Sequence, residues 1–316
     1  MTTITLEDGS PRTLPPAEAL AASNCGVPGV WRFDSGAPGP HVAITALIHG
    51  NEVCGAEALF ALLQQHPMLS RGRLTIAFCN LEAYGRLDDA NKEERRWVDE
   101  DLNRVWGRLE DPGTNAVTYE IRRAREIAPC LDNVDVLLDL HSMSAVAPPL
   151  GLVGLASKNV AFAKRIGYPS FLIRDAGHAA GKRLIDRAPF GDADAPQSAM
   201  LVECGQHFSA DAFESAHEAV RRTIAVFLNG KSIEPEPTQR LIEVVEAVTI
   251  RDEAFEFTQE WSNMSVVEAT GTLIARDGDR EVRTPHDNTY LVMPASARYR
   301  LPGFTAVRFG KLVTAA

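Results

Sequence analysis

An apolar run ends in two ionisable side chains in the stretch Val42-Ala43-Ile44-Thr45-Ala46-Leu47-Ile48-His49-Gly50-Asn51-Glu52. Its apolar and β-branched residues favour an extended strand, and the residues after Glu52 have the spacing of a helix. In an open α/β sheet, ligands bind beyond the carboxyl ends of the strands. The stretch therefore predicts a strand that delivers His49 and Glu52 to a binding site.

Two further apolar runs end in ionisable side chains in the same way. His141 follows the run 134–140, and Glu203 follows the run 198–202. Imidazole and carboxylate are both good zinc ligands, and a catalytic zinc site needs three protein ligands and one open position for water. Parallel strands that end together bring their last residues close, so the sequence predicts one site at one sheet edge. For each residue alone, the alternative is a capping or surface side chain.

The composition is that of a globular protein without a membrane-spanning segment. The chain has 316 residues, of which 45% are hydrophobic, and it contains no apolar run of about 18 residues or more. Residues 1–8 lack the basic and apolar regions of a secretory signal, so we expect a cytoplasmic location. The five cysteines are odd in number and have no C-x-x-C spacing, which argues against a disulfide framework and a thiolate zinc site.

The net charge excludes a polyanionic partner. It is −10 at pH 7 with a pI near 5.3, whereas nucleic-acid binding depends on clustered Lys and Arg. The densest basic cluster, residues 122–125, lies in a segment of helical spacing and indicates a solvated helix face. We therefore expect no nucleic acid and no membrane as partners.

Strand-like and helical segments alternate through the first two thirds of the chain, which predicts an α/β fold with a mixed sheet. The expected helices cover residues 53–65, 116–127, 159–166 and 210–228. A glycine and two prolines in residues 229–237 indicate a boundary, so we expect a catalytic domain over 1–229 and a β-rich domain over 230–316. The β-rich domain should form a small sandwich or barrel that limits substrate access. The opening segment, up to about Cys25, is either a lid or an edge strand.

A segment rich in arginine lies between the first and third predicted ligands, at residues 95–106. A guanidinium offers planar bidentate donors for a carboxylate, and a second one near the metal could stabilise an oxyanion formed at an acyl carbon. Trp and Asn interleaved with Arg suit a pocket. The alternative is a loop of surface salt bridges among Arg, Asp and Glu.

With these motifs, the chain resembles the succinylglutamate desuccinylase/aspartoacylase family, a branch of the zinc carboxypeptidase-like fold. The resemblance covers nearly the whole chain and rests on four ordered motifs: His49-Gly50-Asn51-Glu52, Asp101-Leu102-Asn103-Arg104, Asp139-Leu140-His141 and Val202-Glu203-Cys204-Gly205. It implies a mixed-sheet zinc carboxypeptidase-like catalytic domain followed by a smaller C-terminal β domain. Tyr299 loosely resembles a tyrosine that contacts substrate in the family.

The resemblance also implies roles for the motif residues. One Zn²⁺ per chain would be bound by His49, Glu52 and His141, and Glu203 would activate the attacking water. Two further roles follow from the arginine-rich segment. Arg96 resembles the family arginine that polarises the scissile carbonyl, while Asn103 and Arg104 look like the pair that grips the α-carboxylate of the substrate.

The sequence departs from the aspartoacylase pattern between Arg187 and Glu203. No arginine there matches the one that binds the aspartate side chain, so acetylaspartate is not the expected substrate. Asp192 and Asp194 lie in this segment, either facing a cationic group of the substrate or forming a solvated acidic loop. The sequence favours the solvated loop, because surface loops are commonly polar.

The function predicted from the sequence is a zinc-dependent amidohydrolase that deacylates a small N-acyl amino acid or a related N-acyl amine. One alternative is a zinc carboxypeptidase acting on short peptides. Another is a non-catalytic protein that binds a metal or a metabolite on the same scaffold. The acyl group, the amino acid, the pathway and self-association into a homo-oligomer remain open at this stage.

Overall fold

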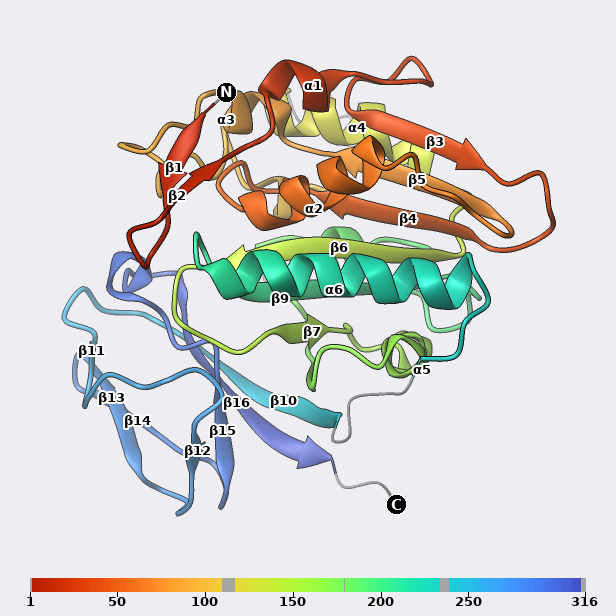
Figure 1. Ribbon diagram of the computed structural model, residues 1–316. Helices are drawn as coiled ribbons and strands as arrows, with labels where there is room; N and C mark the ends of the chain where they lie inside the picture. The colour runs from red at the N-terminus through yellow and green to blue at the C-terminus, as the bar shows by residue number, and fades with distance from the viewer. Residues whose placement is uncertain (1, 110–116, 179, 234–238, 314–316) are drawn as a thin grey trace.

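One mixed sheet of eleven strands carries the fold in the computed structural model, which describes residues 2–109, 117–178, 180–233 and 239–313 (Figure 1). The centre of the sheet is parallel, and antiparallel strands join it on both sides. The predicted α/β fold with a mixed sheet is therefore confirmed. From one edge to the other, the strands are β12 (Val266–Val267), β15 (Thr289–Val292), β16 (Thr305–Val313), β10 (Arg240–Thr249), β8 (Phe171–Arg174), β7 (Leu150–Leu152), β9 (Ser198–Gln206), β6 (Val136–Met143), β4 (His41–Ala46), β5 (Arg73–Phe78) and β3 (Val30–Asp34).

Apolar cores cover both faces of the central strands. In β4, Val42 and Ile44 face the core shared with the helices α2 (Val53–Gln64) and α6 (Ala210–Phe227). Ala43 faces the opposite core, which contains residues of α4 (Tyr119–Leu131). Figure 1 shows α2 and α6 in front of the sheet, with α4 behind it. Burial on both faces explains why β4 reads as a continuous apolar run.

Local capping fixes where the long helices begin. The Ser209 side chain accepts a hydrogen bond from the backbone N–H of Ala212 at the start of α6, and the Thr118 side chain does the same for α4. The helix α5 (Ser157–Ile166) ends at a left-handed Gly167. The four predicted helices are confirmed, although residue 116, the expected start of one, lies outside the described residues. Two short helices, α1 (Ala17–Ala21) and α3 (Leu81–Gly85), pack together.

The C-terminal segment continues the large sheet. Strand β10 pairs in parallel with β8, and β16, β15 and β12 follow it outwards. A second, antiparallel sheet contains β11 (Glu256–Phe257), β13 (Leu273–Asp277) and β14 (Arg280–Arg283). Side chains from both sheets share one apolar core that includes Val248, Ile274 and Phe309. The expected β-rich segment thus has the two-sheet form, while its division from the rest at residue 229 stays a prediction, because residues 234–238 of the linker lie outside the described part.

The opening segment forms a small hairpin of its own. Strand β1 (Thr3–Thr5) pairs with β2 (Pro11–Thr13) in a two-stranded sheet, while β3 is the edge strand of the large sheet. Ile4, Leu6 and Leu14 are buried in the core beside α2 and α6. Of the two roles left open for this segment, the edge strand of the main sheet is therefore wrong.

The basic cluster at residues 122–125 is not a fully solvated helix face. Arg123 is 3% exposed, and its guanidinium donates hydrogen bonds to the backbone carbonyls of Pro28, Phe78 and Cys79. It thereby satisfies carbonyls where β3 and β5 meet their loops. The sequence prediction was wrong at this position because helical spacing alone cannot show which residue of a basic run lies against the sheet.

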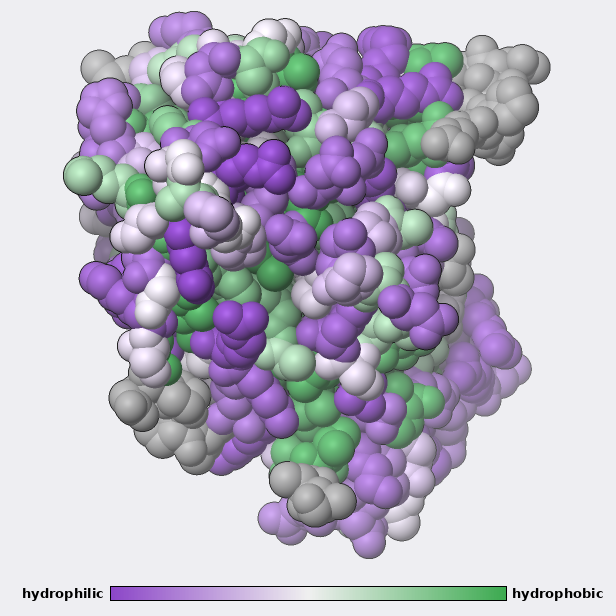
Figure 2. Space-filling model, turned by 90° about the vertical axis from the view of Figure 1, so that its right-hand side faces the viewer, coloured by the Kyte–Doolittle hydropathy of each residue, from purple (hydrophilic) through white to green (hydrophobic). Residues whose placement is uncertain are grey.

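Hydrophilic side chains cover much of the one face of the molecule that Figure 2 shows. Figure 2 shows the molecule from the right-hand side of Figure 1, where hydrophilic side chains are spread widely and hydrophobic ones gather along the middle. No helix in the described ranges is long and apolar enough to cross a membrane. Cys54, Cys79, Cys130 and Cys204 are buried free thiols, and Cys25 is partly buried.

Candidate active site

Three buried side chains meet where the central parallel strands end. His49 and Glu52 lie in the turn between β4 and α2, and His141 lies near the end of β6, which pairs with β4 in parallel. The Nδ1 atoms of His49 and His141 lie 2.8 and 2.7 Å from the two carboxylate oxygens of Glu52. One potential ligand atom from each residue lies within 4.8 Å of the others. The three predicted metal ligands are thus brought together.

Two further carboxylates contact the other ring nitrogens of the two imidazoles. The Nε2 atom of His49 is 2.8 Å from Asp101 Oδ1, and Nε2 of His141 is 2.9 Å from Asp139 Oδ2. Such partners orient a metal-bound imidazole and raise its basicity. Both aspartates stand in the motifs of the sequence, but this role was not predicted for them. The signal was present for Asp139, because residues two apart on a strand point to the same face.

Each imidazole therefore lies between two carboxylates. Burial by itself would lower the pKa of His141, but Asp139 and Glu52 hold that pKa well above its ordinary value. Burial would likewise raise the pKa of Glu52, yet the two histidines hold it well below its usual range. Contacts of this kind at both ring nitrogens are favourable only with an imidazolium, or with a cation between Nδ1 and the carboxylate. The donor set, the burial and the outer aspartates fit a divalent ion such as zinc.

Metal binding should therefore release protons. His141 must lose the hydrogen on Nδ1 before that atom can bind a metal, and its raised pKa keeps this hydrogen in place at neutral pH. We expect zinc affinity to increase with pH above about 6.5. Calorimetric titrations with zinc in two buffers of different ionisation enthalpy would measure the proton release. The variant Asp139→Asn should release fewer protons and bind zinc roughly 10-fold or more weakly. Equal heats in both buffers would contradict the prediction.

Gly50 allows the ligand turn to lie against its neighbours. A Cβ at this position would be 2.6 Å from backbone and side-chain carbons of Ala83 and from the carbonyl oxygen of Arg95. The backbone N–H of Gly50 also donates to the carbonyl of Arg96, at 2.9 Å. The glycine thus holds the ligand turn next to the arginine-rich segment.

Replacing Gly50 should separate these two segments. We expect Gly50→Ala to cost about 1–3 kcal/mol of stability and to weaken zinc binding, because the turn carrying His49 and Glu52 must move. Gly85→Ala is the matched control, since its Cβ would meet its nearest neighbour only at 3.9 Å. Chemical denaturation and zinc titration would measure both effects, and wild-type values for Gly50→Ala would refute the close approach.

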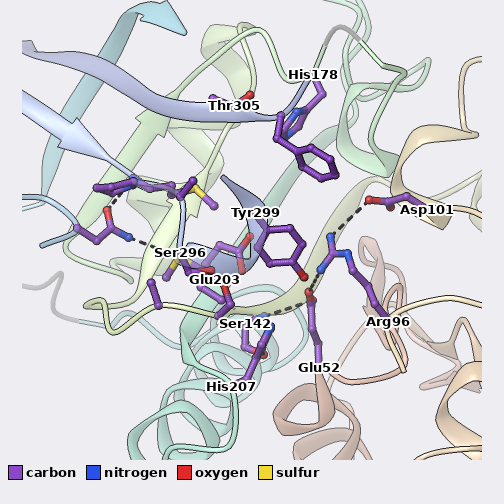
Figure 3. A pocket seen from close by; sticks show the side chains of 18 of the residues that line it. Glu52, Arg96, Asp101, Ser142, His178, Glu203, His207, Ser296, Tyr299 and Thr305 are labelled. Carbon is purple, nitrogen blue, oxygen red and sulfur yellow. Dashed lines mark hydrogen bonds and ion pairs between the residues drawn. The ribbon is translucent and has the colours of Figure 1, made fainter. Parts of the chain in front are cut away.

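Arg96 bridges the two carboxylates nearest the ligand set. Its Nη1 lies 3.0 Å from Glu52 Oε1, and its Nη2 lies 3.4 Å from Asp101 Oδ2 (Figure 3). Burial acts to lower the pKa of Arg96, but Asp101 and Glu52 raise it above its usual value. A permanently charged donor group is therefore held beside the predicted metal position. Tyr299, from the C-terminal segment, lies close to Arg96 and Glu52 in the same view.

The side chains of the adjacent residues Asn103 and Arg104 have different surroundings. Arg104 lines the cavity described below, and its Nη2 lies 3.7 Å from Asp101 Oδ2. Asn103 is 3% exposed, and its side-chain oxygen accepts a hydrogen bond from the backbone N–H of Leu184. Within the described ranges, Asn103 does not line the cavity. Its predicted contact with the substrate stays a prediction.

Glu203 lies next to the ligand set on the neighbouring strand. It is paired in register with His141 across the parallel strands β9 and β6. Its Oε2 atom is buried and has no hydrogen-bond partner within the part of the chain that the structure describes. Burial and the negative charge of Glu52 raise the pKa of Glu203 to about 8. A buried carboxyl of raised pKa beside the cavity is suited to accepting and donating a proton.

The raised pKa of Glu203 has a consequence for stability. The folded, metal-free protein holds this proton more tightly than the unfolded chain, whose value is near 4.5, so stability is lost as the pH rises towards about 8. Metal-free Glu203→Gln should therefore become more stable than the metal-free wild type, by up to about 1.4 kcal/mol per pH unit in this window. Denaturant unfolding between pH 5 and 9 would measure the difference. If the difference in unfolding free energy between the two proteins did not change with pH, the pKa of Glu203 would not be raised.

A cavity of about 210 Å³ opens at this edge of the sheet. In Figure 3, Glu52, Ser142 and His207 lie at one end of the view, and His178 and Thr305 lie at the other. Much of one wall comes from the C-terminal segment, which the sequence analysis expected to limit access without naming these residues. The lining residues are Glu52, Arg96, Trp97, Asp101, Arg104, Ser142–Ala145, His178, Glu203, His207, Asn263, Met293–Ser296, Tyr299, Phe304, Thr305 and Arg308.

Two of the lining histidines are neutral at physiological pH. Burial lowers the pKa of His207 to about 4, and its Nδ1 lies 2.7 Å from the hydroxyl of Ser142. Burial together with nearby arginines lowers the pKa of His178 to about 2. The sequence analysis missed both residues, because neither ends a patterned apolar run. Asp192 and Asp194 are exposed and lie outside the cavity lining in the described part of the chain, which favours the solvated loop.

Comparison with solved structures defines the class of fold. The chain superposes on succinylglutamate desuccinylase from Vibrio cholerae with a TM-score of 0.67 and 16% identity, covering 98% of this chain and 90% of that one. Murine aminoacylase 3 gives a TM-score of 0.61 and 21% identity, covering 87% of this chain and 96% of that one. At these identities, the likeness shows the fold.

Sequence comparison shows which family part of the chain resembles. Residues 38–168 match the model of the succinylglutamate desuccinylase/aspartoacylase catalytic domain. Two curated relatives are similar over a shorter stretch: a protein from Nostoc sp. named "Probable aspartoacylase" is 37% identical over 109 residues, and N-acyl-aromatic-L-amino acid amidohydrolase (carboxylate-forming) B from Danio rerio is 31% identical over 112 residues. Each match covers 33% of this chain and 35% of the relative. The resemblance predicted from the motifs is thus confirmed, and residues 38–168 are similar to the catalytic domain of this family.

Proposed function

We propose that the protein is a zinc-dependent amidohydrolase that removes the acyl group from a small N-acyl amino acid or a related N-acyl amine. The observation that carries the proposal is the buried His49–Glu52–His141 group, with Glu203 in register beside His141 and the cavity open to both Glu52 and Glu203. The names of the relatives support the same reaction class, since one is called a probable aspartoacylase and the other an N-acyl-aromatic-L-amino acid amidohydrolase.

The residues around the ligand set are suited to distinct parts of such a reaction. A bound Zn²⁺ would polarise the acyl oxygen and lower the pKa of water to about 7. Glu203 would take a proton from the water as its oxygen attacks the acyl carbon, and return that proton to the nitrogen as the carbon–nitrogen bond breaks. Arg96 would donate hydrogen bonds to the oxyanion that forms on the acyl oxygen. The products are then one carboxylic acid and one amine, which exist as a carboxylate and an ammonium ion at neutral pH.

The outer groups would hold these parts in place. Asp101 and Asp139 fix the orientation of the two imidazoles, and Asp101 also contacts Arg96. Arg104 would bind a carboxylate of the substrate at the cavity wall. Asn103, predicted from the motif to share that role, would act through its contact with the Leu184 backbone, which supports the segment that carries Arg104.

The size of the cavity supports small substrates over peptides. A volume of about 210 Å³ is below the roughly 300–1,000 Å³ of typical ligand pockets. The C-terminal segment supplies one wall, including Met293 and Phe304. A carboxypeptidase that cleaves longer peptides would need this wall to be open. Turnover of peptides beyond two or three residues would favour that alternative.

The experiment that tests the proposal pairs metal analysis with a hydrolysis screen. The panel contains acetyl, succinyl and formyl derivatives of acidic, basic and apolar amino acids. We expect one zinc per chain and hydrolysis of at least one derivative. Stoichiometric zinc with no hydrolysis across the panel would instead favour a non-catalytic binding protein on this scaffold.

The variant Glu203→Gln tests the proton transfer. It should retain zinc, because Glu203 is not one of the three ligands, but lose roughly 100- to 10,000-fold in kcat, because glutamine cannot accept the proton. Glu253→Gln, at an exposed glutamate of the C-terminal segment, is the control and should keep wild-type activity. Near-normal turnover by Glu203→Gln would remove Glu203 from the mechanism.

A further inference from the structure

Strand β16 carries a buried arginine to the wall of the cavity. Val307 and Phe309 lie in the apolar core between the two C-terminal sheets. Because side chains alternate along a strand, Arg308 between them points to the other face of the sheet. Arg308 is 5% exposed and lines the cavity. A charged side chain is rarely so buried unless it is paired, so its partners indicate what it does.

The partners of Arg308 do not fully compensate its charge. Its Nη2 donates to the neutral Nε2 of His178 at 2.9 Å. Its Nε lies 3.8 Å from Asp175 Oδ2, but both oxygens of Asp175 already lie 2.7 and 3.2 Å from the guanidinium of Arg183. Arg183 also pairs with Asp186. Asp175 is therefore shared, and its shorter contacts go to the other arginine.

Arg104 lies close enough to Arg308 for the two charges to act on each other. Burial lowers the pKa of Arg104, and the positive charge of Arg308 lowers it further. Burial lowers the pKa of His178, and both arginines lower it further, so the imidazole stays uncharged. Both guanidinium groups keep their charge at any physiological pH. Two like charges beside one cavity, one of them buried, are unfavourable until an anion lies near both.

The charges on the cavity wall indicate that a ligand bound there carries a negative charge. Within the described residues, three arginines line the cavity, Arg96, Arg104 and Arg308, and three carboxylates do so, Glu52, Asp101 and Glu203. Two of the carboxylates adjoin the predicted ligands: Glu52 is itself one of them, and Asp101 lies 2.8 Å from His49 and 3.7 Å from Arg104. With a divalent ion bound, the lining would carry an excess of positive charge. The excess lies towards Arg104 and Arg308.

We propose that Arg308, together with Arg104, binds the α-carboxylate of the amino-acid part of the substrate. This proposal rests on the proposed function and adds to it a specificity residue from the C-terminal segment. Two guanidinium groups provide several charge-assisted hydrogen bonds to one carboxylate. Binding of a substrate carboxylate would also explain why β16 carries a charged side chain at a buried position. An arginine with a structural role alone would serve only to tie β16 to Asp175.

The test separates carboxylate recognition from structural support. The variants are Arg308→Gln and the charge-conserving Arg308→Lys, with Arg276→Gln as a control at an exposed arginine of the same segment. Each is also made in the Glu203→Gln background, so that binding can be measured by calorimetry without turnover. The ligands are N-acetyl derivatives of an acidic, an apolar and a basic amino acid, each paired with its α-carboxamide. Zinc content and thermal unfolding are measured for every variant.

We expect Arg308→Gln to weaken binding of the carboxylates by roughly 10- to 100-fold and to raise KM by the same factor, while kcat changes little. Binding of the carboxamides should not change, and Arg308→Lys should show a smaller loss. Should Arg308→Gln fail to fold, the comparison of Arg308→Lys with the wild type on each acid–amide pair carries the same information. Equal effects on acid and amide, or no carboxylate binding by the wild type, would overturn the proposal.

The outcomes also distinguish the two proposals. Carboxylate binding that depends on Arg308 without hydrolysis of any panel member would leave the carboxylate site standing and remove the proposed function. If Arg308→Gln hydrolysed both the acid and the carboxamide as the wild type does, the proposed function would stand. Arg308 would then have no role in binding the carboxylate.

Discussion

The parallel pairing of β4, β6 and β9 is the constraint on which the rest of the site depends. Parallel strands end at the same edge, and here the residues that follow β4 meet the last residues of β6 and β9. His141 and Glu203 are direct register partners. A slip of one residue in this pairing would turn one of them to the opposite face of the sheet. The apolar cores on both faces hold the register and thereby hold the site.

Charge compensation around the ligand set forms a continuous chain. Asp101, His49, Glu52, His141 and Asp139 follow one another, with a carboxylate on each side of every imidazole. Buried groups of this kind are stable only when each is matched by an opposite charge or a hydrogen bond. A divalent cation can replace the protons between the imidazoles and Glu52 without disturbing the outer aspartates. The arrangement that compensates the buried charges is therefore also suited to binding a divalent ion.

The C-terminal strands do more than cover the cavity. They extend the large sheet from β10 outwards, and together with the residues between them they supply one wall of the cavity, including Tyr299 and Arg308. The ligand end of the cavity comes from the first two thirds of the chain, whereas the proposed carboxylate end needs residues from both parts. Under the proposed function, the C-terminal segment contributes to substrate recognition, whereas the three predicted metal ligands all come from the earlier part of the chain. Change in the C-terminal segment could then alter the substrate without disturbing the ligands.

The sequence by itself determined the strand ends, the ligand types and the order of the motifs, because these depend on patterns within a few residues of each other. His49, Glu52, His141 and Glu203 could be named as one site from the way each follows an apolar run. Only the tertiary structure decided that Asn103 turns to the Leu184 backbone, that Arg123 is buried, and that Arg308 and His178 line the cavity. The environment of those side chains is made by residues far away in the chain, and no local pattern carries that information.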